Sequence, residues 1–207
     1  MCMPHIITDG WSLSVMLKDV LCLMAEEKTG KEYEPLRIQY KDFAAWANKN
    51  AMNEELMGAH HDYWIGKLKG KMTPADMHGD APRPPFKTND GKTILFEFDR
   101  ENTAALNQLS RDESATLFMT MLAVLKVLML KYSGVENTNV GTPLAGRDQP
   151  ELENQAGLYL NIVVLNDTVK PEMTFEELLQ TFRQTTLEAY DHQTYPAINL
   201  IDELEIE

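Results

Sequence analysis

Cysteine and basic residues are both scarce in this sequence. Its 207 residues include two cysteines, Cys2 and Cys22, without the CxxC spacing of zinc and dithiol redox sites, so a disulfide framework is also excluded. Lysine and arginine number 19 against 32 acidic residues, which gives a net charge of −13. This acidity argues against general binding to nucleic acids or anionic membranes. We therefore expect a cytoplasmic protein that binds neither.

Long apolar runs and nucleotide-binding motifs are also missing. The most apolar predicted helix, 115–132, has a short core that Lys126 interrupts, so it is better interpreted as a buried helix than as a membrane span. The N-terminus lacks the basic start and apolar run of a secretory signal, and no GxGxxG or P-loop motif occurs. What is present is globular composition, with 43% hydrophobic and 25% charged residues.

Hydrophobic periodicity predicts helices and strands along the whole chain. We expect strands at 1–7, 93–99, 137–142 and 158–165, the last apolar almost throughout and therefore central in its sheet. Helices are expected at 11–29 with Ser12 as N-cap, 40–49, 53–69, 100–109 after Asp99, 115–132 and 174–192, with a last turn from Pro196. The segment 72–92 holds four of the ten prolines and is predicted to cross the surface. This order predicts an α/β or α+β class with a mixed sheet flanked by helices.

The sharpest local feature is the segment from His5 to Ser12. His5 ends a predicted strand, and Asp9 follows four residues later at a turn where Gly10 allows dihedrals that other residues resist. An imidazole in this position can take or deliver a proton near neutral pH. The alternative is a packed histidine beside a helix-capping aspartate, and the spacing alone does not decide between them.

Other polar clusters are less specific. Gly141-Thr142-Pro143 and Ala145-Gly146-Arg147 predict a loop at a strand end, where the arginine can pair with a carboxylate or form an ordinary surface ion pair. His60 and His61 point about 100° apart on a helix and do not suit one metal ion. His78 lies in the proline-rich segment without a partner motif. We expect no metal site.

Taken together, these segments resemble the condensation domain of nonribosomal peptide synthetases, a branch of the chloramphenicol-acetyltransferase-like superfamily. The core motif of that family is His-His-x-x-x-Asp-Gly, and this sequence has Pro4-His5-Ile6-Ile7-Thr8-Asp9-Gly10 followed by Trp11-Ser12. Further blocks follow in the family's order: Tyr40-Lys41-Asp42-Phe43-Ala44-Ala45-Trp46, Tyr63-Trp64, Pro82-Arg83-Pro84-Pro85, Tyr132-Ser133-Gly134, Gly141-Thr142-Pro143, Ala145-Gly146-Arg147, 157–161 and 192–196.

The resemblance implies a coenzyme-A-dependent acyltransferase-like fold and an amide-forming enzyme. The amine of an aminoacyl thioester on a downstream carrier protein would attack an acyl or peptidyl thioester on an upstream one. Both substrates would arrive on 4′-phosphopantetheine arms, with no cofactor bound directly. The implied partners are the two carrier domains and an adenylation domain of the same synthetase.

The resemblance also assigns roles to four residues. His5 would be catalytic, either by positioning or deprotonating the amine or by stabilising the tetrahedral intermediate. Asp9, Gly10 and Arg147 would support the site, with an Asp9–Arg147 ion pair as a hypothesis. Trp11-Ser12 resembles the peptide-forming classes rather than the heterocyclising ones.

The resemblance covers part of a two-lobed domain. We expect 1–71 to form the end of the core-motif strand and the following helices, 72–92 a proline-rich crossover, and 93–207 a truncated C-terminal lobe. The isolated chain is then expected to be inactive, and exposed apolar edges are expected to favour self-association.

Two departures leave alternatives open. Pro4 stands where the family has its first histidine, and Thr194 stands where aspartate is common. One alternative is a non-catalytic condensation-like scaffold that binds carrier proteins or partner enzymes. The other is an acyltransferase that uses a coenzyme A thioester. Pro4 favours the scaffold, whereas the ordered later blocks favour the peptide synthetase branch.

Overall fold

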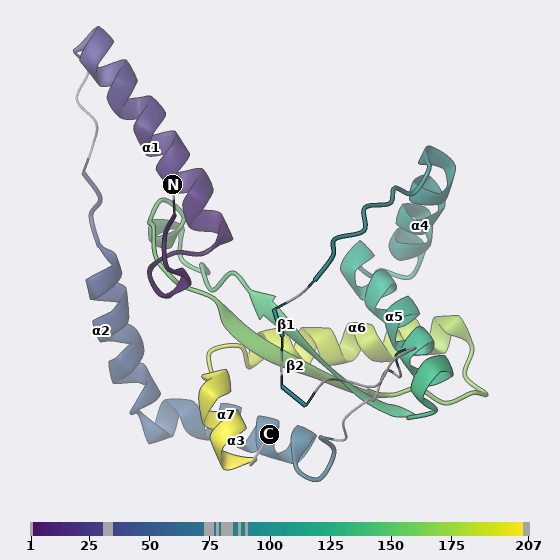
Figure 1. Cartoon of the computed structure of the whole chain (residues 1–207). Helices are drawn as coiled ribbons and strands as arrows, with labels where there is room; N and C mark the ends of the chain where they lie inside the picture. Colours follow the sequence, from purple (N-terminus) through teal and green to yellow (C-terminus); the bar gives the residue numbers. More distant parts are fainter. Residues whose placement is uncertain are drawn as a thin grey trace. The chain divides into compact units, whose positions relative to one another are not determined.

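A computed structural model describes residues 2–30, 35–72, 77, 79, 85–86, 88–89 and 91–204 (Figure 1). The chain divides into two compact units that interleave along the sequence. Unit 1 comprises Met1–Gly66, Gly141–Val163 and His192–Glu207, and unit 2 comprises Lys67–Val140 and Val164–Asp191.

Unit 1 is mostly helical. It contains α1 (Gly10–Thr29), α2 (Tyr40–Ala51), nearly all of α3 (Glu54–Leu68), α7 (Ala197–Glu203) and two short 3-10 helices, η1 (His5–Ile7) and η2 (Pro150–Leu152). Helix α1 ends where Gly30 takes a left-handed φ of 68° and donates its N–H to the Glu26 carbonyl, as expected of a C-terminal glycine. The helices predicted at 11–29, 40–49 and 53–69 are therefore confirmed.

Partly buried hydrogen bonds hold the 192–196 segment in unit 1. Trp64 of α3 is 1% exposed, and its indole N–H donates to the His192 carbonyl at 3.0 Å. The Asn161 amide donates to the carbonyls of Gln193 (2.5 Å) and Tyr195 (2.9 Å). These bonds fix the turn before α7 against both α3 and the residue that begins β2 (Asn161–Thr168).

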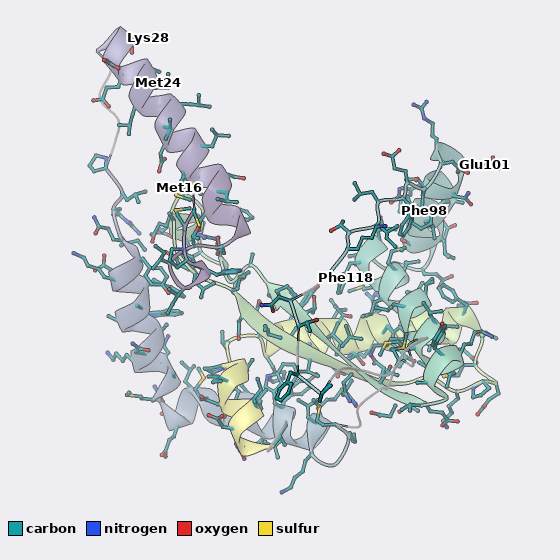
Figure 2. The ribbon with its side chains drawn as sticks, viewed as in Figure 1. Met16, Met24, Lys28, Phe98, Glu101 and Phe118 are labelled. Atoms are coloured by element: carbon teal, nitrogen blue, oxygen red, sulfur yellow. The ribbon has the colours of Figure 1, made fainter. Side chains whose placement is uncertain are left out.

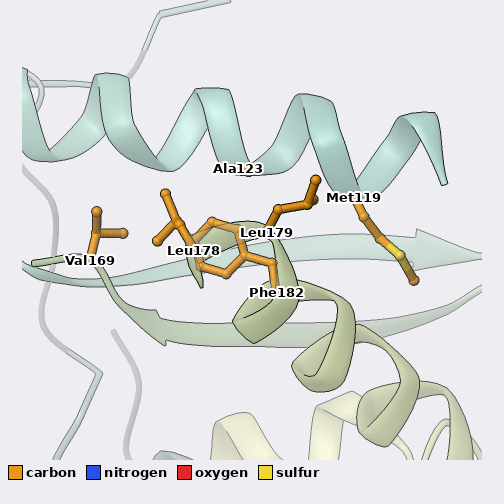
Figure 3. Packing of buried hydrophobic residues seen from close by; sticks show 6 residues of the cluster. All are labelled: Met119, Ala123, Val169, Leu178, Leu179 and Phe182. Atoms are coloured by element: carbon orange, nitrogen blue, oxygen red, sulfur yellow. The ribbon is translucent and has the colours of Figure 1, made fainter. Parts of the chain in front are cut away.

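Unit 2 packs three helices, α4 (Arg100–Asp112), α5 (Leu117–Ser133) and α6 (Phe175–Asp191). Asp99 caps α4 and Thr174 forms a capping box with Glu177 at α6, so each helix begins at a residue type that favours N-caps. Figure 3 shows the core cluster, in which α5 and α6 face one another. Its buried members are Met119, Ala123, Val169, Leu178, Leu179 and Phe182.

Helix α5 is buried along one face only. Leu122 and Lys126 are 5% and 0% exposed, whereas Leu125 and Leu128 are 42% and 49% exposed. No single described helix is long and apolar enough to cross a membrane, and α4 with α5 meets that length and composition test only as a pair bent by 102°.

The described sheet has two strands, β1 (Asn137–Leu144) and β2. The Asn137 amide donates to the Thr168 hydroxyl at 3.3 Å, while Gly141 faces Ile162. Because numbers rise along one strand as they fall along the other, the pair is antiparallel. The described sheet is thus too small to be mixed.

Two strand predictions are wrong, and a third is right only in part. Residues 5–7 form η1 and are exposed, instead of ending a buried strand. Residues 93–99 form no strand, and Leu95 is 90% exposed. The strand expected at 158–165 begins at Asn161 and, with β1 as its one described neighbour, is not central. Apolar patterning indicates which side chains can be buried, but a strand also needs a partner for its backbone groups, and the described residues supply it only between β1 and β2. The predicted crossover at 72–92 lies mostly outside the described residues, as does His78.

Candidate functional site

His5 lies on η1, just before the start of α1. The turn is closed by the Ile7 N–H, which donates to the Pro4 carbonyl at 3.2 Å, and by the Thr8 N–H, which donates to the His5 carbonyl at 3.3 Å. The side chain of His5 is exposed and makes no hydrogen bond to any other described residue. Its ring is therefore open to a substrate group.

Asp9, four residues later, is the N-cap of α1. Its Oδ1 accepts the Ser12 N–H at 2.8 Å, and its own N–H donates to Ser12 Oγ at 3.3 Å, which completes a capping box. The prediction of Ser12 as N-cap is wrong, because Asp9 takes that role. The helix therefore begins at Gly10, whereas an N-cap at Ser12 would start it at Leu13. Gly10 is helical without a positive φ, and a Cβ there would meet no described atom within 4 Å. Its expected unusual dihedral is therefore absent.

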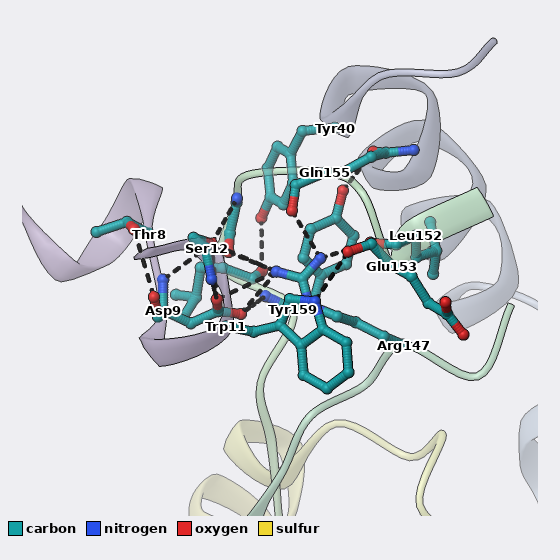
Figure 4. Close-up of polar contacts among 12 residues, drawn as sticks. Thr8, Asp9, Trp11, Ser12, Tyr40, Arg147, Leu152, Glu153, Gln155 and Tyr159 are labelled. Atoms are coloured by element: carbon teal, nitrogen blue, oxygen red, sulfur yellow. Dashed lines mark hydrogen bonds and ion pairs between the residues drawn. The ribbon is translucent and has the colours of Figure 1, made fainter. Parts of the chain in front are cut away.

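Arg147, the predicted partner of Asp9, contacts it from 138 residues away in the sequence (Figure 4). Its Nη2 donates to both Asp9 carboxylate oxygens at 3.1 Å, and each of the two side chains is 1% exposed. The other terminal nitrogen, Nη1, donates to the carbonyls of Leu152 (2.6 Å) and Gln155 (2.8 Å). The hypothesised Asp9–Arg147 ion pair is confirmed as a buried contact that ties the start of α1 to the loop after β1.

Ser12 and Tyr159 complete this network. Ser12 Oγ lies 2.6 Å from Asp9 Oδ1 and 2.9 Å from the Gly157 carbonyl oxygen, and it accepts the Gly157 N–H at 3.0 Å. Tyr159 donates its N–H to Asp9 Oδ2 at 3.3 Å, and its ring centre lies 4.0 Å from the Arg147 guanidinium carbon. The Asp9 carboxylate thus accepts hydrogen bonds from Ser12 and Tyr159, and the Tyr159 ring lies against the Arg147 guanidinium.

The network favours the ionised form of Asp9. Burial by itself raises the pKa of Asp9, but hydrogen bonds from the Ser12 hydroxyl and from the N–H groups of Ser12 and Tyr159 lower it, as does the charge of Arg147. The net effect holds the pKa below its usual value of 3.8. Asp9 is therefore a poor general base at neutral pH and is suited to bracing the loop that follows His5.

Comparison with known proteins identifies the family of this chain. A family model described as the condensation domain matches residues 2–207. The chain belongs to the condensation domain family. Among its relatives, one of the linear gramicidin synthase proteins of Brevibacillus parabrevis is 40% identical over 205 residues, which cover 98% of this chain and 4% of that protein. Bacitracin synthase 3 of Bacillus licheniformis is 36% identical over 205 residues, 99% of this chain and 3% of that protein.

Solved structures share the fold of this chain. The SgcC5 protein of Streptomyces globisporus matches with a TM-score of 0.81 and 26% identity over 96% of this chain and 44% of its own. The X-domain from teicoplanin biosynthesis, in a structure of its complex with OxyB, matches with a TM-score of 0.87 and 21% identity over 98% of this chain and 46% of its own. The predicted α/β acyltransferase-like fold is confirmed. The condensation-domain chain described here spans less than half of either solved chain and a few per cent of the synthetases.

The sequence did not predict that Ser12 and Tyr159 join the network of this condensation domain. Both lie in segments already noted for their resemblance to the family, Ser12 beside the core motif and Tyr159 within 157–161. That resemblance was the available signal. It marked the segments without showing that Ser12 and Gly157, 145 residues apart, are bonded.

Two other histidines also come together. The Nδ1 atoms of His60 and His192 lie 2.9 Å apart, and the His192 ring stacks on Tyr63 with centroids 4.0 Å apart. Burial lowers the pKa of His60, and His192 lowers it further. Among the described residues no group of three or more His, Cys, Asp or Glu side chains could hold a metal ion.

Proposed function

We propose that this chain is part of a catalytic condensation domain that forms amide bonds between carrier-bound thioesters. The observation that carries the proposal is the buried Asp9–Arg147 pair, which braces the loop immediately after His5 in a chain of the condensation family. The relatives named above are peptide synthetases. An exposed imidazole at the end of a braced loop suits proton transfer or hydrogen bonding to a bound substrate.

In the proposed reaction the amine nitrogen of the acceptor attacks the carbonyl carbon of the donor thioester. A C–N bond forms and the C–S bond breaks. The proton that the amine loses is finally taken up by the departing thiolate, which leaves as a thiol. His5 positions or deprotonates the amine, or donates a hydrogen bond to the tetrahedral intermediate. Arg147 and Asp9 hold the loop in place. Gly10 has no side chain, so the backbone there can lie close to the substrates.

The proposed substrates arrive on 4′-phosphopantetheine arms, so the domain binds no cofactor of its own. The proposed partners are an upstream and a downstream carrier domain and an adenylation domain of the same synthetase, all in the cytoplasm. Along the chain, 1–71 carries the core motif and its helices, 72–92 crosses over, and 93–207 belongs to the C-terminal lobe.

A second candidate is a non-catalytic scaffold that binds a partner enzyme. Pro4 favours it, since proline supplies neither the imidazole of the family's first histidine nor a backbone donor. The fold similarity to the X-domain, solved in a complex with OxyB, is consistent with it.

Substitution of His5 tests the first candidate. In the parent synthetase, His5→Ala is expected to lower the rate of amide formation by about a hundredfold, the size of a lost proton-transfer group. The assay uses carrier proteins loaded with donor and acceptor, and the isolated chain is expected to give no turnover. His61→Ala replaces another histidine of unit 1 and should leave the rate unchanged. If His5→Ala and the unsubstituted synthetase had equal rates, His5 would not be a catalytic residue. If the unsubstituted synthetase formed no amide but bound a partner enzyme, the scaffold would be favoured.

Self-association is expected of the isolated chain. Helix α1 exposes a row of apolar side chains, Leu13 (56%), Leu17 (63%), Leu21 (58%) and Met24 (51%). Figure 2 labels Met24 of this helix. Such patches favour association in water. Light scattering should give a mass above that of one chain. The pair Leu17→Lys and Leu21→Lys should shift it towards the monomer, whereas Ser14→Lys on the same helix should not. If the unsubstituted chain were monomeric at micromolar concentration, this expectation would be contradicted.

A further inference from the structure

Unit 1 contains a cavity that the proposed roles of His5, Asp9 and Arg147 do not use. Its volume is about 470 Å³, within the range of small-molecule sites. The walls come from α2, α3, the segment after β1 and the turn before α7, and they include Phe43, Trp46, Leu56, Met57, Leu158 and Tyr159. Three blocks that resemble the condensation family, 40–46, 157–161 and 192–196, therefore meet around one space.

The cavity has a buried apolar part and an exposed part of mixed character. Met57, Leu152 and Tyr159 are 8%, 5% and 4% exposed, so they form the buried part of the wall. The exposed part of the wall includes the polar residues Asp148, Gln149 and Thr194. It also includes the apolar residues Trp46, Leu56 and Leu160. Such a cavity suits a ligand with an apolar end that points inward and a polar end that stays near water.

Charge further restricts the ligand. Among the described lining residues there is no lysine or arginine, and the one carboxylate is the exposed Asp148. A phosphate or a carboxylate would find no cation in the walls, and a buried charged group would be poorly solvated. Two aromatic contacts, Phe43–Tyr159 at 4.6 Å and Phe43–Trp46 at 6.0 Å between ring centroids, provide flat apolar surfaces instead.

Tyr159 connects the cavity to the braced loop. Its ring is part of the cavity wall and also lies against the Arg147 guanidinium, at 4.0 Å, while its N–H donates to Asp9. A group in the cavity is thus separated from the Asp9–Arg147 pair by one side chain.

We propose that the cavity holds the uncharged apolar side chain, branched aliphatic or aromatic, of an aminoacyl thioester substrate. The proposal rests on the proposed function above. The side chain occupies the buried apolar part, and the amide or thioester of the same residue remains at the exposed part, near Asp148, Gln149 and Thr194. Both the acceptor, with a free amine, and the donor, with an acylated amine, carry this chemistry.

Binding of stable substrate analogues to the purified chain tests the cavity without requiring turnover. The probes are pantetheine amides of glycine, leucine, phenylalanine and aspartate, each with a free and an N-acetylated amine, measured by titration calorimetry. The leucyl and phenylalanyl probes are expected to bind about tenfold more tightly than the glycyl and aspartyl probes, because they bury several more carbons. The better-bound amine form distinguishes acceptor from donor.

Variants on α2 provide the matched comparison. Ala47 and Ala51 line the cavity, whereas Ala45 is exposed on the same helix and is not a lining residue. Ala47→Leu and Ala51→Leu should each remove most of the leucyl preference, and Ala45→Leu should retain it, with unchanged helical circular dichroism in all three. Equal binding of glycyl and leucyl probes, or a preference that survives both filled variants, would overturn the proposal. If this chain preferred the leucyl probe but the parent synthetase formed no amide, the proposed reaction would be overturned and the proposal for the cavity would stand.

Discussion

Replacement of Arg147 by methionine is expected to lower the free energy of unfolding of unit 1 by about 3–5 kcal/mol, the usual cost of breaking a buried ion pair from one side. The substitution leaves the Asp9 carboxylate buried without its cation and removes the Arg147 bonds to the Leu152 and Gln155 carbonyls. Of these two, the Leu152 carbonyl keeps the backbone N–H of Gln155, at 3.3 Å. Asp9 would then retain only its bonds from Ser12 and from the Tyr159 N–H.

Tryptophan fluorescence during urea unfolding measures this effect. All three tryptophans, Trp11, Trp46 and Trp64, belong to unit 1, so their signal reports on that unit. The measurement should be made at pH 7, above the usual aspartate pKa, where Asp9 is ionised in both the folded and the unfolded state. Because folding lowers the pKa of Asp9, its contribution is fully present above the unfolded pKa and is lost as the pH falls through the folded one.

Arg37→Ala is the matched control for Arg147. Arg37 also pairs with a carboxylate, that of Glu151, but the two side chains are 77% and 37% exposed. Its loss should cost under about 1 kcal/mol. Adding Asp9→Asn to Arg147→Met should restore part of the stability, since the unpaired charge is removed with it. Similar unfolding midpoints for Arg147→Met and Arg37→Ala would show that the buried pair contributes little.

The sequence predicts the helices well because they are specified by nearby residues. Asp99, Thr174 and Gly30 each act within one turn of their helix, so capping preferences identify those ends. Ser12 was misassigned because Asp9 is an equally good cap three residues earlier. The choice between them depends on Arg147 and Gly157, which approach only in the folded chain.

The strands and the site depend on long-range contacts, and only part of them could be predicted. The residues at 93–99 and 158–160 have strand-like composition but no strand pairing in the described chain. Asp9 and Arg147 were linked through resemblance to a family, because no local rule joins residues 138 positions apart. The cavity beside Tyr159 depends on four separate segments and was not predicted at all.

Lys126 shows the same limit and supports the second large effect. It was expected only to interrupt an apolar helix, yet it is 0% exposed. Its Nζ donates to Asp167 Oδ2 at 2.5 Å and to the Leu165 carbonyl at 2.7 Å, and it lies 5.1 Å from the centre of the Phe182 ring. Burial lowers the pKa of Lys126, and Asp167 offsets part of that effect.

Lys126→Met is therefore expected to lower the free energy of unfolding of unit 2 by about 3–5 kcal/mol. Methionine preserves most of the packing volume of lysine but leaves Asp167, whose side chain is 1% exposed, without a counter-charge. Unit 2 contains no tryptophan. Its unfolding in urea is therefore followed as the change in far-ultraviolet circular dichroism that tryptophan fluorescence does not report.

Two comparisons separate the charge effect from a general effect of methionine on α5. Lys131→Met alters an exposed lysine of the same helix and should change stability by less than about 0.5 kcal/mol. The double variant Lys126→Met with Asp167→Leu removes both charges and should be more stable than Lys126→Met alone, since apolar replacement of a whole buried pair is often neutral. If the double variant were as unstable as the single one, lost packing rather than an unpaired Asp167 would be the cause. If Lys126→Met unfolded at the same urea concentration as Lys131→Met, the buried pair would add nothing to the stability of unit 2.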